Sequence, residues 1–407
     1  MEKSIVMRLL RSNTIFFFVF QLWWSCLFSV FFNPINAQES DTTSRWHKPE
    51  VNGYVKYLPS VRLSNDFKEH FSDQLLHNRI NVHWKMAANI QFQGALRTRL
   101  FYGETVEAFP FYADFVAKDP GWLQLSWILL EQRRFLLHTT SDRFFLDFSK
   151  DKWHVRVGRQ RINWGINMVS NPNDLFNTYS FFDFDYEERP GTDAVRIQYF
   201  SGPLSRFELA YSPADTWQEQ VVAGMYAMNW KGYDVQFSGG VFNNRATKGL
   251  GWAGNIKQTG FKGEINFFHD LRPSATIDPW NVVAAVSIDH LFNNGSFIMG
   301  EYLFNQIRPG EEAELFLLTQ PLRADNLSFT DHALLINYTY PLNMRWTIGA
   351  AGIYYPRESG MFFSPSAQWS AAQNIDVLLI SQLFFGSDKG ILSQAGYLLA
   401  GAMKWSF

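Results

Sequence analysis

The sequence predicts an all-β fold, a closed antiparallel transmembrane β-barrel of about 16 to 18 strands preceded by a helical signal peptide. Three observations support this prediction: an apolar N-terminal segment, a two-residue alternation of apolar and polar side chains, and an aromatic residue at the end of the chain. The alternation is typical of strands, and a transmembrane barrel turns one face of each strand to lipid and the other to its lumen.

The composition is compatible with such a barrel. The chain has 407 residues, 17% of them aromatic, and a formal net charge of −2. Its mean hydropathy of −0.18 is too low for a helical membrane protein. The near-zero charge gives no sign of nucleic-acid binding. Cys26 is the single cysteine, so disulfides and cysteine-based zinc sites are excluded for the rest of the chain. We expect no cofactor.

The N-terminus has the pattern of an export signal. Lys3, Arg8 and Arg11 precede an apolar run from residue 14 to 32, and the small residue Ala37 follows it. We therefore expect a signal peptide at 1–37, a short extension at 38–50 and the barrel at 51–407. An uncleaved anchor is the alternative, because the run is nearly long enough to cross ~30 Å of hydrocarbon.

Strand-like alternation returns throughout the remaining chain. Phe144, Leu146 and Phe148 alternate with Arg143 and Asp147, and Phe145 is the exception. The same period recurs at 153–158, 195–199, 207–211, 261–267, 336–340 and 344–349. Short polar joints at 150–152, 231–232, 293–295, 341–343 and 373–374 predict hairpin turns. Longer connections lie at about 104–125, 163–190, 270–279 and 307–330. Short turns at one end and long loops at the other favour a membrane barrel.

A soluble β-sandwich or propeller would also alternate. The outward sets are crowded with aromatic and leucine side chains, whereas the opposite face carries charges, which favours the barrel. On this assignment the pore-lining candidates are Arg143, Asp147, His154, Arg156, Arg196, Glu208, Lys262, Glu264, Arg345 and Lys404. Rings of charge set ion preference in pores, but opposite charges on neighbouring strands would neutralise one another. Arg143 beside Arg156 would favour anions, and Asp147 beside His154 or Arg156 would favour neutralisation.

The chain ends on Phe407, with Trp405 and Met403 in the same parity. This ending resembles the C-terminal signature of bacterial outer-membrane barrels. The resemblance implies that the barrel-assembly machinery reads the last strand, with Phe407 as the assembly signal. Pairing of this strand with the first one would remove both sheet edges, which lipid cannot satisfy.

The segment 142–177 carries the most specific local pattern. It contains a Gly-Arg-Gln strand end, a Trp-Gly pair and an Asn-Pro-Asn-Asp loop, with the motif residues Gly158, Arg159, Gln160, Trp164, Gly165, Asn171, Pro172 and Asp174. This pattern resembles the alginate-export-like and phosphate-selective-porin-like branch of the porin superfamily of Gram-negative bacteria. The resemblance implies a partly arginine-lined lumen and an inward-folded loop. The opening at Gln38 and the stretch 53–56 resemble exported proteins of Bacteroidetes.

Two interpretations of this segment stay open. In the first, the segment is a loop-folding motif in which Arg159 pairs with a carboxylate such as Asp174. In the second, the loop folds into the barrel, narrows it, and places Arg156, Arg159 and Arg161 in the path of the solute. Arg159 shares the parity of outward Val155 and Val157, so a bulge or strand end is needed there. The acidic stretch 183–188 suits calcium in principle, but no EF-hand spacing accompanies it, and we expect no metal site.

The expected function is a porin-like channel for small polar or anionic solutes, with selectivity set by the charged lumen and an inward loop near 163–190. The alternative is a non-conducting barrel with a structural, adhesion or envelope-assembly role. No hydrolase motif occurs, so we expect no enzyme, although a Ser-His-Asp site built across strands would leave no local trace. The expected partners are outer-membrane lipid, the assembly machinery and small solutes but no nucleic acid, and a homotrimer stays open.

Overall fold

The computed structural model describes residues 48–119, 121–178, 181–182, 189–272, 278–307, 322–386, 392 and 395–407. The predicted signal peptide at 1–37 lies outside the described residues and stays a prediction. The strands are β1 (Glu50–Leu63), β2 (His70–Ala87), β3 (Ile90–Gly103), β4 (Ser126–Gln132), β5 (Phe135–Lys150), β6 (Trp153–Gln160), β7 (Thr192–Gly202), β8 (Ser205–Ser212), β9 (Val221–Trp230), β10 (Tyr233–Phe242), β11 (Arg245–Ile256), β12 (Thr259–Asp270), β13 (Trp280–Leu291), β14 (Phe297–Asn305), β15 (His332–Pro341), β16 (Trp346–Tyr355), β17 (Gly360–Ala372), β18 (Ile375–Phe385) and β19 (Tyr397–Ser406).

Helical structure is confined to short pieces in the described residues. These are α2 (Glu104–Ala108), α3 (Tyr112–Ala117), a 3₁₀ turn, η1 (Trp217–Glu219), and the helical residues Leu392 and Ala395. None of the described helices has the length and apolar character needed to cross a membrane.

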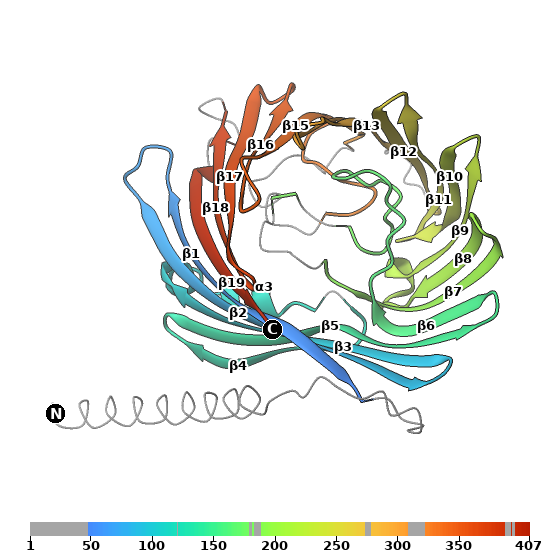
Figure 1. Cartoon of the computed structure of the whole chain (residues 1–407), viewed down its shortest axis with the longest axis horizontal. Helices are drawn as coiled ribbons and strands as arrows, with labels where there is room; N and C mark the ends of the chain where they lie inside the picture. Colours follow the sequence, from blue (N-terminus) through green and yellow to red (C-terminus); the bar gives the residue numbers. More distant parts are fainter. Residues whose placement is uncertain are drawn as a thin grey trace. The chain divides into compact units, whose positions relative to one another are not determined.

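The strands form one antiparallel sheet that closes on itself (Figure 1). The last strand, β19, pairs with β1, with Ser406 opposite Tyr54. The strand β4 is additional to the wall, because β3 pairs directly with β5. On the other edge of β5, β4 pairs with Phe135–Thr140 and β6 pairs with Phe144–Lys150. Eighteen of the nineteen strands therefore form the wall, which confirms the predicted closed antiparallel barrel and its strand number.

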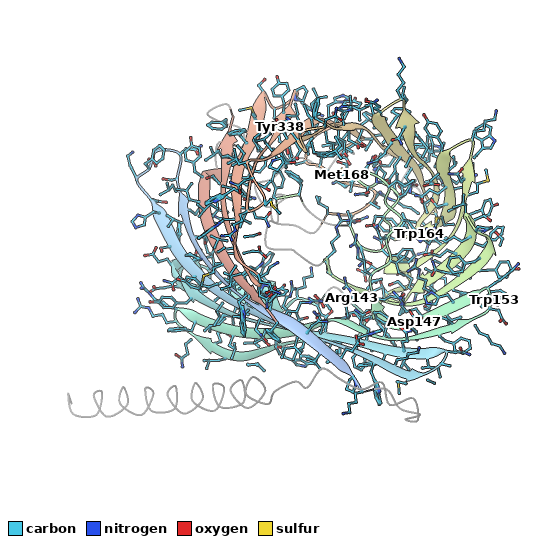
Figure 2. All side chains as sticks on the ribbon, viewed as in Figure 1. Arg143, Asp147, Trp153, Trp164, Met168 and Tyr338 are labelled. Atoms are coloured by element: carbon cyan, nitrogen blue, oxygen red, sulfur yellow. The ribbon has the colours of Figure 1, made fainter. Side chains whose placement is uncertain are left out.

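The two faces of the wall differ as the alternation predicts. Phe144 and Leu146 point outward and are 51% and 50% exposed, whereas Asp147 points inward and is 7% exposed. Figure 2 shows the same division, with Trp153 on the outside of the ring and Asp147 on the inside. The exception, Phe145, also faces inward, and the Arg156 guanidinium lies 4.3 Å from its ring centroid. An apolar outer face is what contact with lipid requires.

The connections at the two ends of the barrel differ in length. Two-residue turns such as Lys231–Gly232 join β9 to β10, with φ of 52° and 85°, as a type I′ hairpin turn requires. The other predicted short joints connect β5 to β6, β13 to β14, β15 to β16 and β17 to β18, so all of them lie at the same end. The four predicted long connections follow β3, β6, β12 and β14 and lie at the opposite end.

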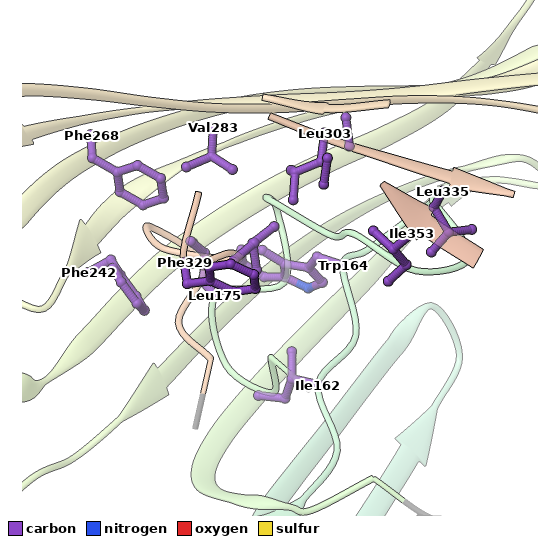
Figure 3. Packing of buried hydrophobic residues seen from close by; sticks show 14 of the residues in the cluster. Ile162, Trp164, Leu175, Phe242, Phe268, Val283, Leu303, Phe329, Leu335 and Ile353 are labelled. Carbon is purple, nitrogen blue, oxygen red and sulfur yellow. The ribbon is translucent and has the colours of Figure 1, made fainter. Parts of the chain in front are cut away.

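Two of the long connections fold into the barrel. The described part of 161–191, here called the lumenal loop, and the segment 322–331 contact inward side chains of β8, β11, β12 and β14. Their apolar residues pack with inner-face residues of the wall, as Figure 3 shows for Ile162, Trp164, Leu175 and Phe329 among others. The lumen therefore has an apolar, packed sector beside β8–β18, which leaves the charged residues of β1–β7 on the other side.

Candidate functional site

Charged and polar side chains from four consecutive strands meet on the inner face of the wall. We call them the β5–β8 charge cluster: Asp147, His154, Arg156, Arg196, Gln198 and Glu208. Register places Arg156 opposite both Asp147 and Arg196. Arg156 Nη2 lies 2.6 Å from Asp147 Oδ2, and His154 Nε2 lies 2.5 Å from Asp147 Oδ1. Asp147 therefore neutralises Arg156, and the arrangement in which Arg143 and Arg156 act as an unopposed pair is not found.

The other end of the cluster joins the wall to the lumenal loop. Arg196 donates two hydrogen bonds to the buried carboxylate of Glu208, at 2.7 and 2.9 Å, and Gln198 donates a third at 2.7 Å. Trp164 Nε1 of the loop donates to the same carboxylate at 2.5 Å. Because Arg196 and Gln198 approach from β7 and Trp164 approaches from the loop, Glu208 fixes the position of the loop relative to β7 and β8.

A second group of charges, the β1–β3 basic face, lies next to this cluster. It consists of inward residues of β1, β2, β3 and β19: Lys56, Arg79, Arg97, Arg99 and Lys404. Carboxylates of the same parity on these strands are Glu50 and Asp73, at opposite ends. Arg79 makes a bidentate pair with Asp142 of β5, at 2.5 and 2.9 Å. On these four strands, basic residues therefore outnumber acidic ones in the middle of the face; Lys56, Arg79 and Arg97 are buried, and Arg99 and Lys404 are half-buried.

A register shift on β5 allows the Arg79–Asp142 pair. Ala95 of β3 faces Arg143, but the next residue, Leu96, faces Ser141, so Asp142 has no partner of its own in the ladder. Such a bulge lets two successive residues point to one side. Asp142 reaches Arg79, and Arg143 bonds the carbonyl oxygens of Asp142 and Arg189 at 2.6 and 2.7 Å. Arg143 therefore holds the end of the lumenal loop.

The lumenal loop is anchored through its backbone by acidic residues of the wall. Glu264 of β12 accepts hydrogen bonds from the amides of Ile166, Asn167 and Asn173, the last two at 2.8 and 2.9 Å. Glu301 of β14 accepts one from the Ser170 amide at 2.8 Å. These amides have no backbone partners in the described part of the loop, so the carboxylates accept the hydrogen bonds that secondary structure would otherwise satisfy.

Arg159 of the family-like motif pairs with carboxylates, as predicted. It is 1% exposed and bonds Asp119 and Asp193, with nitrogen–oxygen distances of 2.8 Å, in place of Asp174, the carboxylate that the prediction named as an example. No register shift occurs beside it; it stays opposite Phe144 at the end of β6, where Asp119 and the Leu123 carbonyl cover it. Gly158, with φ of 119°, precedes it, and β6 ends two residues later at Gln160.

The other motif residues hold the loop together. Gln160 donates to the Ala194 carbonyl at 3.0 Å, Asn171 donates to Val169 at 3.0 Å, and the Pro172 carbonyl accepts from Asn266 at 3.2 Å. Gly165 lies so close to Asn171 that a Cβ would come within 2.2 Å of its Oδ1. Burial raises the pKa of Asp174 to about 6, against the opposing effect of Arg161 and Arg189.

The remaining candidates are scattered. Lys262 Nζ pairs with Asp289 at 2.9 Å, and Lys404 Nζ lies 5.9 Å from the centroid of the Tyr54 ring. Arg345 lies in the exposed turn before β16 and not within a strand. Phe407 exchanges two backbone hydrogen bonds with Gly53, at 2.9 and 3.0 Å, and so extends the closing pair of strands. The acidic stretch 183–188 lies outside the described residues.

Sequence reasoning missed most of the β1–β3 basic face. The signal was present, because Arg97 and Arg99 alternate with Leu96, Thr98 and Leu100, and Lys56 lies between Val55 and Tyr57. Period-two counting over 54–58 and 95–101 would have assigned these cations to the lumen.

One serine–histidine contact deserves comparison with hydrolase sites. Ser126 Oγ lies 2.7 Å from His138 Nε2, and both side chains are buried. The other ring nitrogen, Nδ1, lies 3.3 Å from Arg99 Nη2, which can only donate. Nδ1 is therefore the acceptor and Nε2 carries the proton, which leaves no base to take the serine proton.

Comparison of structures places this barrel among outer-membrane porins by fold. It is similar to OccAB1 of Acinetobacter baumannii (TM-score 0.54, 9% identity, 91% of this chain and 98% of that one). It is also similar to OccD3 (OpdP) of Pseudomonas aeruginosa (TM-score 0.53, 10% identity, 90% and 92%) and to OccAB4 of A. baumannii (0.54, 9%, 89% and 99%). No family model matches the sequence, and no curated protein aligns with it significantly.

Sequence identities of 9–10% to these structures establish similarity of fold alone. The match nevertheless covers nine tenths of the chain and agrees with the closed wall of eighteen strands and the apolar outer face. The predicted porin-type outer-membrane barrel is thus confirmed at the level of the fold, while the Bacteroidetes origin stays a prediction. The chain has the fold of the Gram-negative outer-membrane porins.

Proposed function

We propose that the protein is an outer-membrane channel for small polar or anionic solutes. The inner surface of β1–β3 and β19 supports this proposal most directly. Five basic residues lie there on two neighbouring rows, with Arg79 paired to Asp142, and the carboxylates of the same parity on these four strands stand only at the strand ends. A row of fixed positive charge in a low-dielectric wall attracts anions and repels cations.

The lumenal loop would set the width of the path. Its anchors on β8, β12 and β14 hold it against one side of the barrel, so solutes would pass between the loop and the basic face. The β5–β8 charge cluster lies at the boundary of the two and is largely neutralised within itself. On this proposal the anion preference comes from β1–β3 and β19 and not from Arg156.

Reversal potential in planar bilayers tests the proposal. Under a potassium chloride gradient, the purified protein should show discrete conductance steps and a preference for chloride. Arg99→Gln and Lys404→Gln should each shift the reversal potential towards cation selectivity. Arg133→Gln is the matched control, because Arg133 lies in an exposed turn with its side chain 85% exposed. Wild-type chloride preference that survives both lumenal changes would contradict the proposal.

A non-conducting structural role is the second candidate. The packed apolar cluster between the two lumenal segments and the wall favours it, since side chains there fill space that an open channel would leave to water. The test is to show by heat-modifiability on gels that the purified protein is folded and then to record it in planar bilayers. Folded protein that gives no conductance steps would support this role. We propose no enzymatic activity, because the Ser126–His138 contact is oriented against proton abstraction.

A further inference from the structure

A small cavity lies inside the packed sector of the lumen, on the side away from the basic face. Its volume is about 60 Å³, and its walls are the lumenal loop, the segment 322–329 and the inner faces of β14, β15 and β16. By the usual measure, this is room for roughly four water molecules. Phe181, Phe182, Phe329 and Tyr355 supply aromatic walls, and the described lining residues include no lysine or arginine.

One carboxylate projects into this apolar space. Glu301 is 4% exposed and sits on the inward parity of β14, opposite Ser287 and Leu335. Its Oε1 accepts the Ser170 amide at 2.8 Å, whereas Oε2 is buried and has no hydrogen-bond partner among the described residues. A buried carboxylate oxygen without a partner is costly, so a bound donor would be stabilised strongly there.

We propose that this cavity is a binding site for a small primary ammonium ion of methylammonium size. The ammonium group would donate to Glu301 Oε2 and to neighbouring oxygens, and the methyl group would lie against the aromatic rings. A cation near aromatic faces is attracted by their π-electrons, most strongly where water is excluded. A divalent metal is disfavoured, because it requires six or more oxygen ligands and the described lining side chains supply one carboxylate, two serine hydroxyls and the Tyr355 hydroxyl.

This inference goes beyond the proposed channel and does not depend on it. The site lies behind the lumenal loop and would take a cation, whereas the proposed path takes anions along β1–β3 and β19. An ammonium bound there would join the loop to β14 and stabilise the docked loop, since a ligand that binds only the folded state raises its stability.

Titration calorimetry of the full-length protein in detergent micelles tests the site. Methylammonium chloride should give saturable binding, whereas sodium chloride and methanol, which lack either the methyl group or the charge, should not. Glu301→Gln should weaken methylammonium binding about tenfold or more, because it replaces the charged acceptor by a neutral amide. Glu131→Gln, an exposed glutamate of β4, should bind like the wild type. Equal heats from methylammonium and sodium chloride would overturn the proposal.

A second variant covers the case in which Glu301→Gln fails to fold. Ala333 lines the cavity and is 7% exposed, so Ala333→Leu would fill the space and leave the carboxylate in place. We expect it to lose methylammonium binding; wild-type affinity in this variant would refute the site. Conductance in bilayers separates the two proposals: binding without conductance leaves this inference standing and removes the channel, and conductance without binding does the reverse.

Discussion

Arg156 and Asp147 are register partners on β6 and β5, and their side chains form an ion pair of 2.6 Å on the inner face of the barrel. Both are largely shielded, with 23% and 9% of their side chains exposed. Arg156, which the sequence assigns to the pore lining, therefore belongs to a neutral ion pair. Its effect on permeant ions depends on Asp147.

A double-mutant cycle across this pair should reveal the compensation. Arg156→Ala alone leaves Asp147 without its arginine partner and should shift the reversal potential towards cations. Asp147→Ala alone leaves an unopposed guanidinium and should shift it towards anions. The double variant should return close to the wild type, because the net lumenal charge is restored. Equal shifts in the single and double Arg156 variants would mean that the pair does not govern the field there.

The acidic anchors predict a second effect. Glu264→Ala would leave the amides of Ile166, Asn167 and Asn173 without their acceptor, and a buried donor left without a partner costs about 1–3 kcal/mol. We expect the lumenal loop to detach while the barrel stays closed. Trypsin should then cleave after Arg161, and single-channel conductance should rise.

The exposed Glu69→Ala is the control for this change and should keep the wild-type digestion pattern. Loss of the folded barrel on gels would show that Glu264 supports the wall itself. A loop that stays resistant to trypsin in Glu264→Ala would contradict its role as an anchor.

The wall was predictable because its rule is local. In each strand, side chains alternate between the lipid-facing and the lumen-facing side. The short turns at Asp151, Lys231 and Gln373 mark where one strand ends and the next begins. The hydrogen bonds between Phe407 and Gly53 of β1 were also predictable, because the backbone groups at both edges of the sheet need hydrogen-bond partners in lipid. The predicted inward fold of the loop near 163–190 agrees with the described part of that connection.

The partners inside the lumen were not predictable in the same way. Arg159 bonds Asp119 and Asp193, which lie 40 and 34 residues away in the chain. The bulge at Asp142 and the extra strand β4 have no periodic trace, because each is a single irregularity in an alternating pattern. Glu264 was assigned to the lumen from its parity, but its role in holding loop amides required the loop's path.

The pairing of β1 with β19, which closes the barrel, should not tolerate even a methyl side chain at Gly53. A Cβ on Gly53 would lie 2.2 Å from the Arg79 carbonyl oxygen and 2.9 Å from the Phe407 ring. Gly53→Ala should therefore push β1 away from β2 or displace Phe407, and lower the yield of folded barrel. At Gly300, also within a strand, an added Cβ meets nothing closer than 3.9 Å. Gly300→Ala should fold normally, and heat-modifiability of both variants on gels is the measurement. If Gly53→Ala and Gly300→Ala fold equally well, closure of the barrel does not depend on a glycine at position 53.

Docking of the lumenal loop should depend on pH through Asp174. Burial raises the pKa of this carboxyl from about 3.9 in an unfolded chain to about 6 in the docked loop. A raised carboxyl pKa means that the docked state favours the protonated form. The stabilisation is therefore complete below pH 4 and is lost as the pH rises through 6.

Hydrogen–deuterium exchange of peptides covering 165–178, corrected for the intrinsic pH dependence of exchange, measures this directly. Protection should fall between pH 4 and pH 7 in the wild type. Asp174→Asn should keep the loop protected across that range, because the neutral amide carries no charge to bury. Asp151→Asn, in an exposed turn, should follow the wild-type curve. A wild-type profile without a step near pH 6 would mean that Arg161 and Arg189 hold the Asp174 charge well enough to offset its burial, and that loop docking is set by the wall carboxylates alone.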